Sequence, residues 1–277
     1  MICSGFYTVY LIKFYTISSF SDSAGGGGDP HFIGFGGIYF TYQGHCDLIL
    51  VKSTKHMKPN TSFQVHIRLT RVRKWSKIDT IAVKVDRNVV EITSKEGKLI
   101  FNGNEVEEVE NKSLTIVKSK LKEHIHLYMF SIHQDKKLEV KVNTRSHMIY
   151  TALNGNYPRD TKGILGSPYQ PGLVTRNGVH MPPASVNTFA ETWQVRDSDP
   201  NLFTISRAPH YPATCLYDVK KPVGKQQNRH LKQLLTVWME EATAVCSTHH
   251  PGPLQNFCLD DVFVTGDLDS AKDEFYD

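Results

Sequence analysis

The sequence predicts a mainly β fold that ends in a small α-helical segment. Short runs of aromatic and branched residues follow one another after Gly28 at spacings of roughly ten residues, the rhythm of an all-β sandwich or barrel. One of these runs alternates apolar and polar residues, as a strand with one buried face does. Helical spacing of apolar residues appears only in the last quarter of the chain.

Eight segments are predicted to be strands or strand pairs. In chain order they are residues 36–44, 46–53, 63–75, 80–93, 98–109, 113–120, 124–133 and 137–145. The fourth is expected to turn back over Asp86–Asn88 and the fifth at Asn102–Gly103, which is a hairpin sequence. In the third, the apolar positions are Phe63, Val65, Ile67 and Leu69, and the polar positions between them are Gln64, His66, Arg68 and Thr70. We therefore expect a half-buried strand there.

The second half of the chain begins with a region rich in Gly, Pro and Asn, residues 154–183, which we expect to be a long structured loop. Phe189 and Trp193 follow it as expected core anchors. An apolar stripe at helical spacing then predicts a helix, and a second short helix is expected over residues 257–267. The stripe consists of Leu231, Leu234, Leu235, Trp238, Ala242 and Val245.

The segment that opens the β region, GDPHFIGFGGIYFTYQGHCDL, resembles the start of the von Willebrand factor type D (VWD) domain. The matching positions are Gly28, Asp29, Pro30, His31, Phe32, Phe35, Gly37, Tyr39, Gly44 and Cys46, while Gly36 replaces the usual aspartate. GILGSP at residues 163–168, NTFAETWQV at 187–195 and the FCLDDVFVTGD stretch resemble later family motifs, the last of them from the helical, cysteine-rich C8 segment.

This resemblance implies an extracellular, two-sheet β-sandwich-like module of the kind found in adhesive, gel-forming and matrix proteins. It divides the chain into a VWD domain at residues 25–196 and a connector with a reduced C8-like helical segment at 197–277. Residues 1–24 are read either as a signal-like segment or as a fragment of an upstream region, because they are apolar but lack a basic start.

The bond between Asp29 and Pro30 is the first candidate site. An aspartate carboxylate can attack its own main-chain carbonyl, proline is a comparatively good leaving group, and His31 could shuttle the proton. Some relatives in the resembled family cleave themselves at this bond, and others keep it intact. Self-cleavage is therefore an alternative function, with Asp29, Pro30 and His31 as its residues.

Calcium is the second candidate, since the resemblance implies an Asn- and Asp-rich loop with oxygen ligands. Here that loop is GSPYQPGLVTRNG, which contains no carboxylate, so a shell would depend on Asp29, backbone carbonyls and Asp160, Asn154 or Asn177. We expect the site to be degraded and tight calcium binding to be absent. No other cofactor is indicated.

The five cysteines are Cys3, Cys46, Cys215, Cys246 and Cys258, without any C-x-x-C pair. Cys246 and Cys258 flank a short loop and are the favoured disulfide pair. The resemblance implies a bridge from Cys46 to the loop position that Leu165 occupies here, so that bridge cannot form. Cys46 and Cys215 are either paired with each other or free.

A basic run supplies a third candidate, a sulfated-glycan or acidic-partner site formed by Arg68, Arg71, Arg73, Lys74 and Lys77. Its alternative is an ordinary solvated strand face. Asn60 and Asn111 begin glycosylation sequons. The net charge of +4 and the lack of a known motif disfavour nucleic acid as a partner.

No hydrolase, metalloprotease or phosphate-loop motif occurs, and no apolar run is long enough to span a membrane. The sequence thus predicts a non-enzymatic, structural or adhesive interaction module of a larger secreted or membrane-anchored protein. Its expected partners are other extracellular proteins or matrix.

Overall fold

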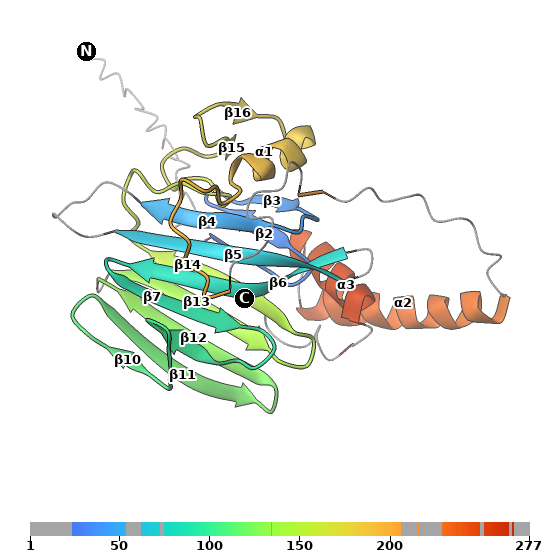
Figure 1. The fold of residues 1–277 in the computed structure, drawn as a ribbon. Helices are drawn as coiled ribbons and strands as arrows, with labels where there is room; N and C mark the ends of the chain where they lie inside the picture. Colours follow the sequence, from blue (N-terminus) through green and yellow to red (C-terminus); the bar gives the residue numbers. More distant parts are fainter. Residues whose placement is uncertain are drawn as a thin grey trace, which may run out of the picture.

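The computed structural model of the 277-residue chain describes residues 24–53, 62–72, 75–133, 135–205, 215–216, 229–249, 252–265 and 268. For residues 229–238, 253 and 263–265 only the backbone is described. Strands dominate the first two thirds of these residues and helices the end, so the predicted mainly β fold is confirmed (Figure 1).

Two antiparallel sheets form the body of the molecule. The larger contains, in spatial order, β10 (Val109–Glu110), β11 (Leu114–Lys122), β12 (Ile125–Ile132), β13 (Lys136–Asn143), β14 (Met148–Gly155), β1 (Ala24–Gly27), β2 (His31–Gly34) and β3 (Ile38–Thr41). The smaller contains β4 (Asp47–Ser53), β5 (Phe63–Val72), β6 (Trp75–Val85), β7 (Asn88–Thr93), β8 (Leu99–Phe101) and β9 (Asn104–Val106). One continuous apolar core is shared by the two sheets, which defines a sandwich.

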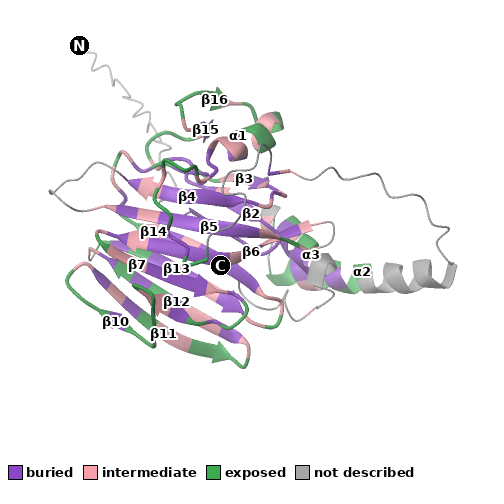
Figure 2. Cartoon of the chain, viewed as in Figure 1, coloured by how far each residue is buried: buried purple, intermediate pink, exposed green. Residues whose placement is uncertain are grey.

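Local sequence explains the hairpins of this sandwich. The turn between β8 and β9 places Asn102 at φ 49° and Gly103 at φ 85°, the left-handed values that a two-residue hairpin turn needs. Asp86, between β6 and β7, is also left-handed, at φ 56°. Along β12 and β13 buried and more exposed residues largely alternate, as expected for a sheet with one face on the core (Figure 2).

The strand β5 departs from the expected half-buried pattern. His66 is fully buried and Arg68 is 9% exposed, although both lie on the face predicted to be solvated. Residues of the connector cover this face of β5, because Leu202 and Phe203 pack with Ala82 on the outer side of the sheet. The prediction of a solvated face was therefore wrong at these two positions.

The long loop after β14 covers the edge of the smaller sheet. Lys162 and Lys52 exchange backbone hydrogen bonds of 2.7 and 2.9 Å, and Ile164 donates to the Ile49 carbonyl. A small hairpin, β15 (Leu173–Val174) with β16 (His180–Met181), a turn of 3₁₀ helix η1 (Pro183–Ser185) and helix α1 (Val186–Thr192) follow. Phe189 and Trp193 are buried there as predicted. The loop thereby removes an exposed strand edge.

Two helices, α2 (Arg229–His249) and α3 (Pro253–Thr265), form a hairpin at one end of the sheets (Figure 1). Ala242, Cys246, Cys258 and Val262 form a small separate core between them. Both predicted helices are confirmed, while the side chains of the stripe from Leu231 to Trp238 lie outside the described part. Among the described helices, none is both long and apolar enough to cross a membrane.

Candidate functional site

The glycine run before Asp29 forms strand β1 in the interior of the larger sheet, between β14 and β2. Glycine is required there by close packing: a Cβ on Gly25 would overlap the Thr151 carbonyl, and one on Gly27 would overlap the Tyr150 ring. Gly28 then takes φ +60° and turns the chain towards Asp29 and Pro30. The run is therefore structural, and it delivers the Asp29–Pro30 bond to a buried turn.

Asp29 is 6% exposed, and its carboxylate accepts a hydrogen bond from the Gln43 amide. Gln43 is itself fixed, because its Oε1 accepts the backbone N–H of Ser76 at 2.7 Å. Burial raises the pKa of Asp29 to about 6, the Gln43 hydrogen bond acts in the opposite direction, and the nearby Asp260 carboxylate raises it further. Asp29 is consequently a carboxyl group that takes up a proton under mildly acidic conditions.

His31 follows on β2 and is almost fully buried. Its Nδ1 lies 2.8 Å from the Thr41 hydroxyl, its Nε2 lies 3.9 Å from a carboxylate oxygen of Asp260, and its ring stacks on Phe257 at 4.3 Å. Burial lowers the pKa of His31 to about 3, so the ring is neutral near pH 7 and its approach to Asp260 is not an ion pair there. A charged imidazolium is thus not the proton source at this turn.

Helix α3 completes the site from the far end of the chain. Asp261 accepts the Asp29 backbone N–H through Oδ1 at 2.8 Å and the Tyr150 hydroxyl through Oδ2 at 3.1 Å. Its neighbour Asp260 faces His31, and burial raises the pKa of Asp260. The turn is therefore enclosed between the larger sheet and α3, which leaves Asp29 and Pro30 shielded from solvent.

The sequence singled out Asp29, Pro30 and His31, and the structure places all three in this turn. It missed Gln43, Tyr150, Phe257, Asp260 and Asp261, which surround them. A signal for α3 was present, because Asp261 is the second aspartate of the FCLDDVFVTGD stretch. The stretch is recognisable in the sequence, but nothing local to it indicates that this aspartate contacts Asp29.

The carboxylates of the described residues do not form a cluster for a calcium ion. No group of three or more His, Cys, Asp or Glu side chains in the described part is arranged to hold a metal. Asp29 is enclosed under α3, Asp160 accepts the Ser53 hydroxyl at 2.8 Å, and the loop at 163–178 carries no carboxylate. Carboxylate ligands are therefore not gathered for calcium among the described residues, and the loss of tight calcium binding stays a prediction.

The proposed basic site on β5 and β6 needs correction at Arg68. Its guanidinium forms two 2.8 Å hydrogen bonds to Asp47, donates to the Ile205 carbonyl at 2.7 Å, and lies 4.2 Å from the centre of the Phe203 ring. Arg68 is thus a buried structural cation. Arg71 is exposed, Lys77 is partly buried with its pKa lowered by burial, and Arg73 and Lys74 lie outside the described residues.

Two disulfides are present, Cys46–Cys215 and Cys246–Cys258. The second is the pair that the sequence favoured, and the first resolves the alternative left open for Cys46 and Cys215. Leu165, at the family's usual cysteine position, is buried in the core instead. Cys3 lies outside the described residues.

One of the two sequons can be placed. Asn111 is exposed at the start of the turn into β11, where its side-chain oxygen accepts the backbone N–H groups of Ser113 and Leu114 at 3.0 Å. Asn60 lies outside the described part. Glycosylation of either remains a prediction.

Comparison with known families agrees with the architecture. Residues 25–168 match the von Willebrand factor type D domain, which is more than half of the chain. No curated protein matches the chain. The protein belongs to the von Willebrand factor type D domain family, and the helical hairpin lies beyond the matched region. Family membership is consistent with an extracellular adhesive or protein-interaction module.

Proposed function

We propose that the chain is an extracellular structural or adhesive module, part of a larger secreted or membrane-anchored protein, whose partners are other extracellular proteins or matrix. The observation that carries this proposal is the pair of disulfides on a VWD sandwich. Cys46–Cys215 joins residues 169 positions apart, and Cys246–Cys258 joins α2 to α3. Such bonds persist in oxidising compartments.

Secretion of the chain from eukaryotic cells, followed by digestion without reduction, tests this proposal. The expected result is two cross-linked peptide pairs with the connectivity of the structure, together with release of folded protein into the medium. The same chain made in a reducing cytosol is the control and should have a lower melting temperature. Free thiols at Cys46 and Cys215 in secreted material would contradict the extracellular assignment.

A second candidate function is self-processing at the Asp29–Pro30 bond, and the raised pKa of buried Asp29 favours it. In the proposed step, an oxygen of the protonated carboxyl attacks the main-chain carbonyl carbon of Asp29. The bond to Pro30 breaks, and the carboxyl proton passes to the proline nitrogen. The products are a cyclic anhydride at Asp29 and a new amino terminus at Pro30. Water or another nucleophile then opens the anhydride.

The chain contains its own control for this reaction, a second Asp-Pro bond at Asp199–Pro200. Asp199 is ion-paired with Arg176. Burial raises the pKa of Asp199, but the hydrogen bond from Arg176 and other contacts outweigh burial, so the pKa is lowered overall. At pH 5.5 the folded chain should be cut before Pro30 and left intact before Pro200. Simple acid hydrolysis of unfolded chain would cut both bonds.

Mass spectrometry and amino-terminal sequencing after incubation at pH 5.5 and pH 7.5 provide the readout. Asp29→Asn should abolish the cut, whereas Asp199→Asn should leave it unchanged. A folded chain that stays intact at pH 5.5 for days would remove the self-processing candidate and would leave the structural role untouched.

A further inference from the structure

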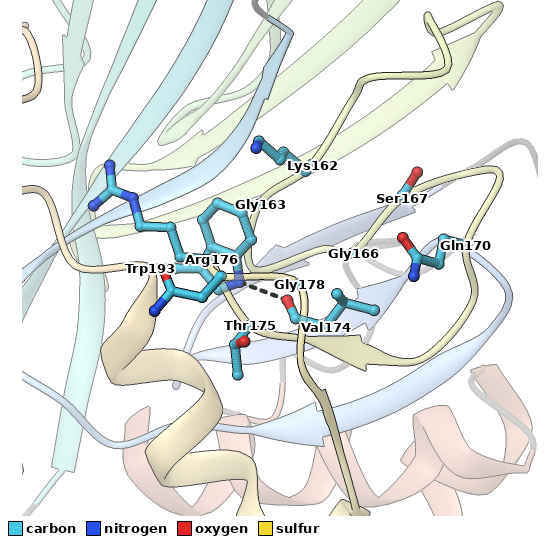
Figure 3. A pocket seen from close by; sticks show the side chains of 11 residues that line it. Lys162, Gly163, Gly166, Ser167, Gln170, Val174, Thr175, Arg176, Gly178 and Trp193 are labelled. Carbon is cyan, nitrogen blue, oxygen red and sulfur yellow. Dashed lines mark hydrogen bonds between the residues drawn. The ribbon is translucent and has the colours of Figure 1, made fainter.

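The loop that joins β14 to α1 encloses a pocket of about 320 Å³ (Figure 3). Its lining comes from the segment that starts at Lys162, from the β15–β16 hairpin and from the end of α1. The lining residues are Lys162, Gly163, Gly166, Ser167, Gln170, Val174, Thr175, Arg176, Asn177, Gly178 and Trp193. This volume falls in the range of roughly 300–1,000 Å³ that small-molecule sites have.

The charged side chains of the lining are all positive. It contains two cations, Lys162 and Arg176, several neutral hydrogen-bonding side chains, and no carboxylate. Trp193 lies at the centre of the view in Figure 3, with its indole N–H donating to the Val174 carbonyl at 3.1 Å. Trp193 is only 1% exposed, so the partly exposed Val174 is the apolar side chain that the lining offers to a ligand.

The surroundings leave positive charge in excess. Arg176 pairs with Asp199, and the Lys52 ammonium lies 3.5 Å from the same carboxylate. The pKa of Lys52 is lowered by burial first, and the positive charges of Arg176 and Lys162 contribute in the same direction. Arg176 and Lys52 therefore share one carboxylate, and Lys162 adds a third positive charge near them.

Of these three cations, Lys162 is the one that does not pair with the Asp199 carboxylate. Its side chain is exposed, and within the described part of the chain its ammonium makes no hydrogen bond or ion pair. Arg176, by contrast, is held by Asp199 and by the Gln194 carbonyl at 3.2 Å. An anionic group in the pocket would give Lys162 its missing partner and would lie in the field of the fixed Arg176.

We propose that this pocket binds an acidic sugar unit, either a uronate or a sulfate ester. The acidic group contacts Lys162, the hydroxyls contact Ser167, Gln170 and Asn177, and the sugar ring lies against Val174. A sugar suits the volume better than a bare oxyanion, since the pocket has room for roughly ten waters. This site is distinct from the Asp29 turn and does not depend on either function proposed above.

Titration of the full chain with single compounds tests the proposal, followed by calorimetry and by the tryptophan indole N–H signals in the NMR spectrum. The probes are glucuronic acid and N-acetylglucosamine 6-sulfate, with glucose, sodium sulfate and calcium chloride as comparisons. We expect an acidic sugar to bind at one site, to shift an indole signal, and to weaken as ionic strength rises.

Two variants locate the site. Lys162→Glu and Gln170→Glu change exposed rim residues and should each weaken acidic-sugar binding at least about tenfold. Lys120 is an exposed residue on β11, outside the pocket, and Lys120→Glu makes the same charge change as Lys162→Glu. This control should leave the affinity within about twofold of the wild type. Melting temperatures of all three variants show whether each is folded. Absence of binding, equal binding of Lys162→Glu, or sulfate or calcium binding as tightly as the sugars would each overturn the proposal.

Discussion

The carboxylate of Asp261 in α3 accepts the backbone N–H of Asp29 at 2.8 Å, across 232 residues of chain. The same carboxylate accepts the hydroxyl of Tyr150 on β14. One side chain of the helical hairpin therefore satisfies a buried donor of the family's first motif and a buried donor of the sheet. Leaving such donors unpaired costs roughly 1–3 kcal/mol each, so α3 is part of the turn's structure.

Gly28 has no room for a side chain, so the stability of the fold should be sensitive to a single methyl group added there. A Cβ there would overlap the Asp261 carboxylate, in addition to the strain of φ +60°. Gly28→Ala should therefore displace α3 and lower the free energy of unfolding by more than about 2 kcal/mol. Gly103→Ala has similar strain at φ +85° with no neighbour within 4 Å, and should cost only about 1 kcal/mol. Urea denaturation of both variants measures the difference, and equal losses would contradict the contact with Asp261.

The raised pKa of Asp29 predicts a pH-dependent effect of Asp29→Asn. Between pH 4 and pH 6 the folded wild type keeps a proton that the unfolded chain has lost, so its stability falls as pH rises through this window. Asparagine does not titrate and retains an oxygen for the Gln43 amide. The stability of Asp29→Asn relative to wild type should therefore increase by up to about 3 kcal/mol between pH 4 and pH 7.

The checks are denaturation curves for both proteins at several pH values, on chain shown by mass to be intact. His31 titrates with the opposite sign, but it is present in both proteins and its contribution largely cancels. A pH-independent difference would show that Asp29 keeps an ordinary pKa.

The burial of Arg68 predicts a loss of stability instead of a loss of glycan affinity on substitution. Arg68→Ala removes the guanidinium that forms the ion pair with the buried Asp47 carboxylate, which should cost about 3–5 kcal/mol. Arg87→Ala removes an exposed arginine at the β6–β7 turn and should change stability by less than about 0.5 kcal/mol. Thermal and chemical unfolding compare the two, and an Arg68 variant as stable as the Arg87 variant would mean that the ion pair contributes nothing.

The two disulfides should differ in how strongly they stabilise the fold. Loop-closure entropy predicts roughly 5 kcal/mol for Cys46–Cys215, with a separation of 169, and roughly 3 kcal/mol for Cys246–Cys258, with a separation of 12. Replacing both cysteines of each pair by serine in turn, and measuring unfolding in guanidinium, tests this order. A larger loss from the short loop would reverse it.

Local patterns were sufficient to predict most of the sandwich. The hairpin at Asn102–Gly103 and the hairpin after Val85 depend on residues within a few positions of each other, and their turn residues identify them. Ala242 and Val245 likewise revealed the helix that packs on α3, because helical spacing is a local property.

Long-range relationships were not predictable in this way. Strand β1 consists almost entirely of glycine, which has low β propensity, and its pairing with β14 joins residues more than 120 positions apart. The cover over His66 and Arg68 comes from Leu202 and Phe203, which read as connector because they lack any periodic pattern. Asp261 had a recognisable motif, but only tertiary structure brings it to Asp29.

The position of β1 also determines what a break after Asp29 would do to the molecule. The residues before the break would still be hydrogen-bonded on both sides, to Tyr150–Leu153 and to His31–Ile33, within a continuous sheet. The two pieces would stay together as a nicked complex under native conditions and would come apart only on unfolding. The segment that ends at Asp29 would then be held by strand pairing and by the hydrogen bonds of Asp29 to Gln43 and Asp261, so mechanical load on it would be resisted by non-covalent contacts in shear instead of by a covalent bond.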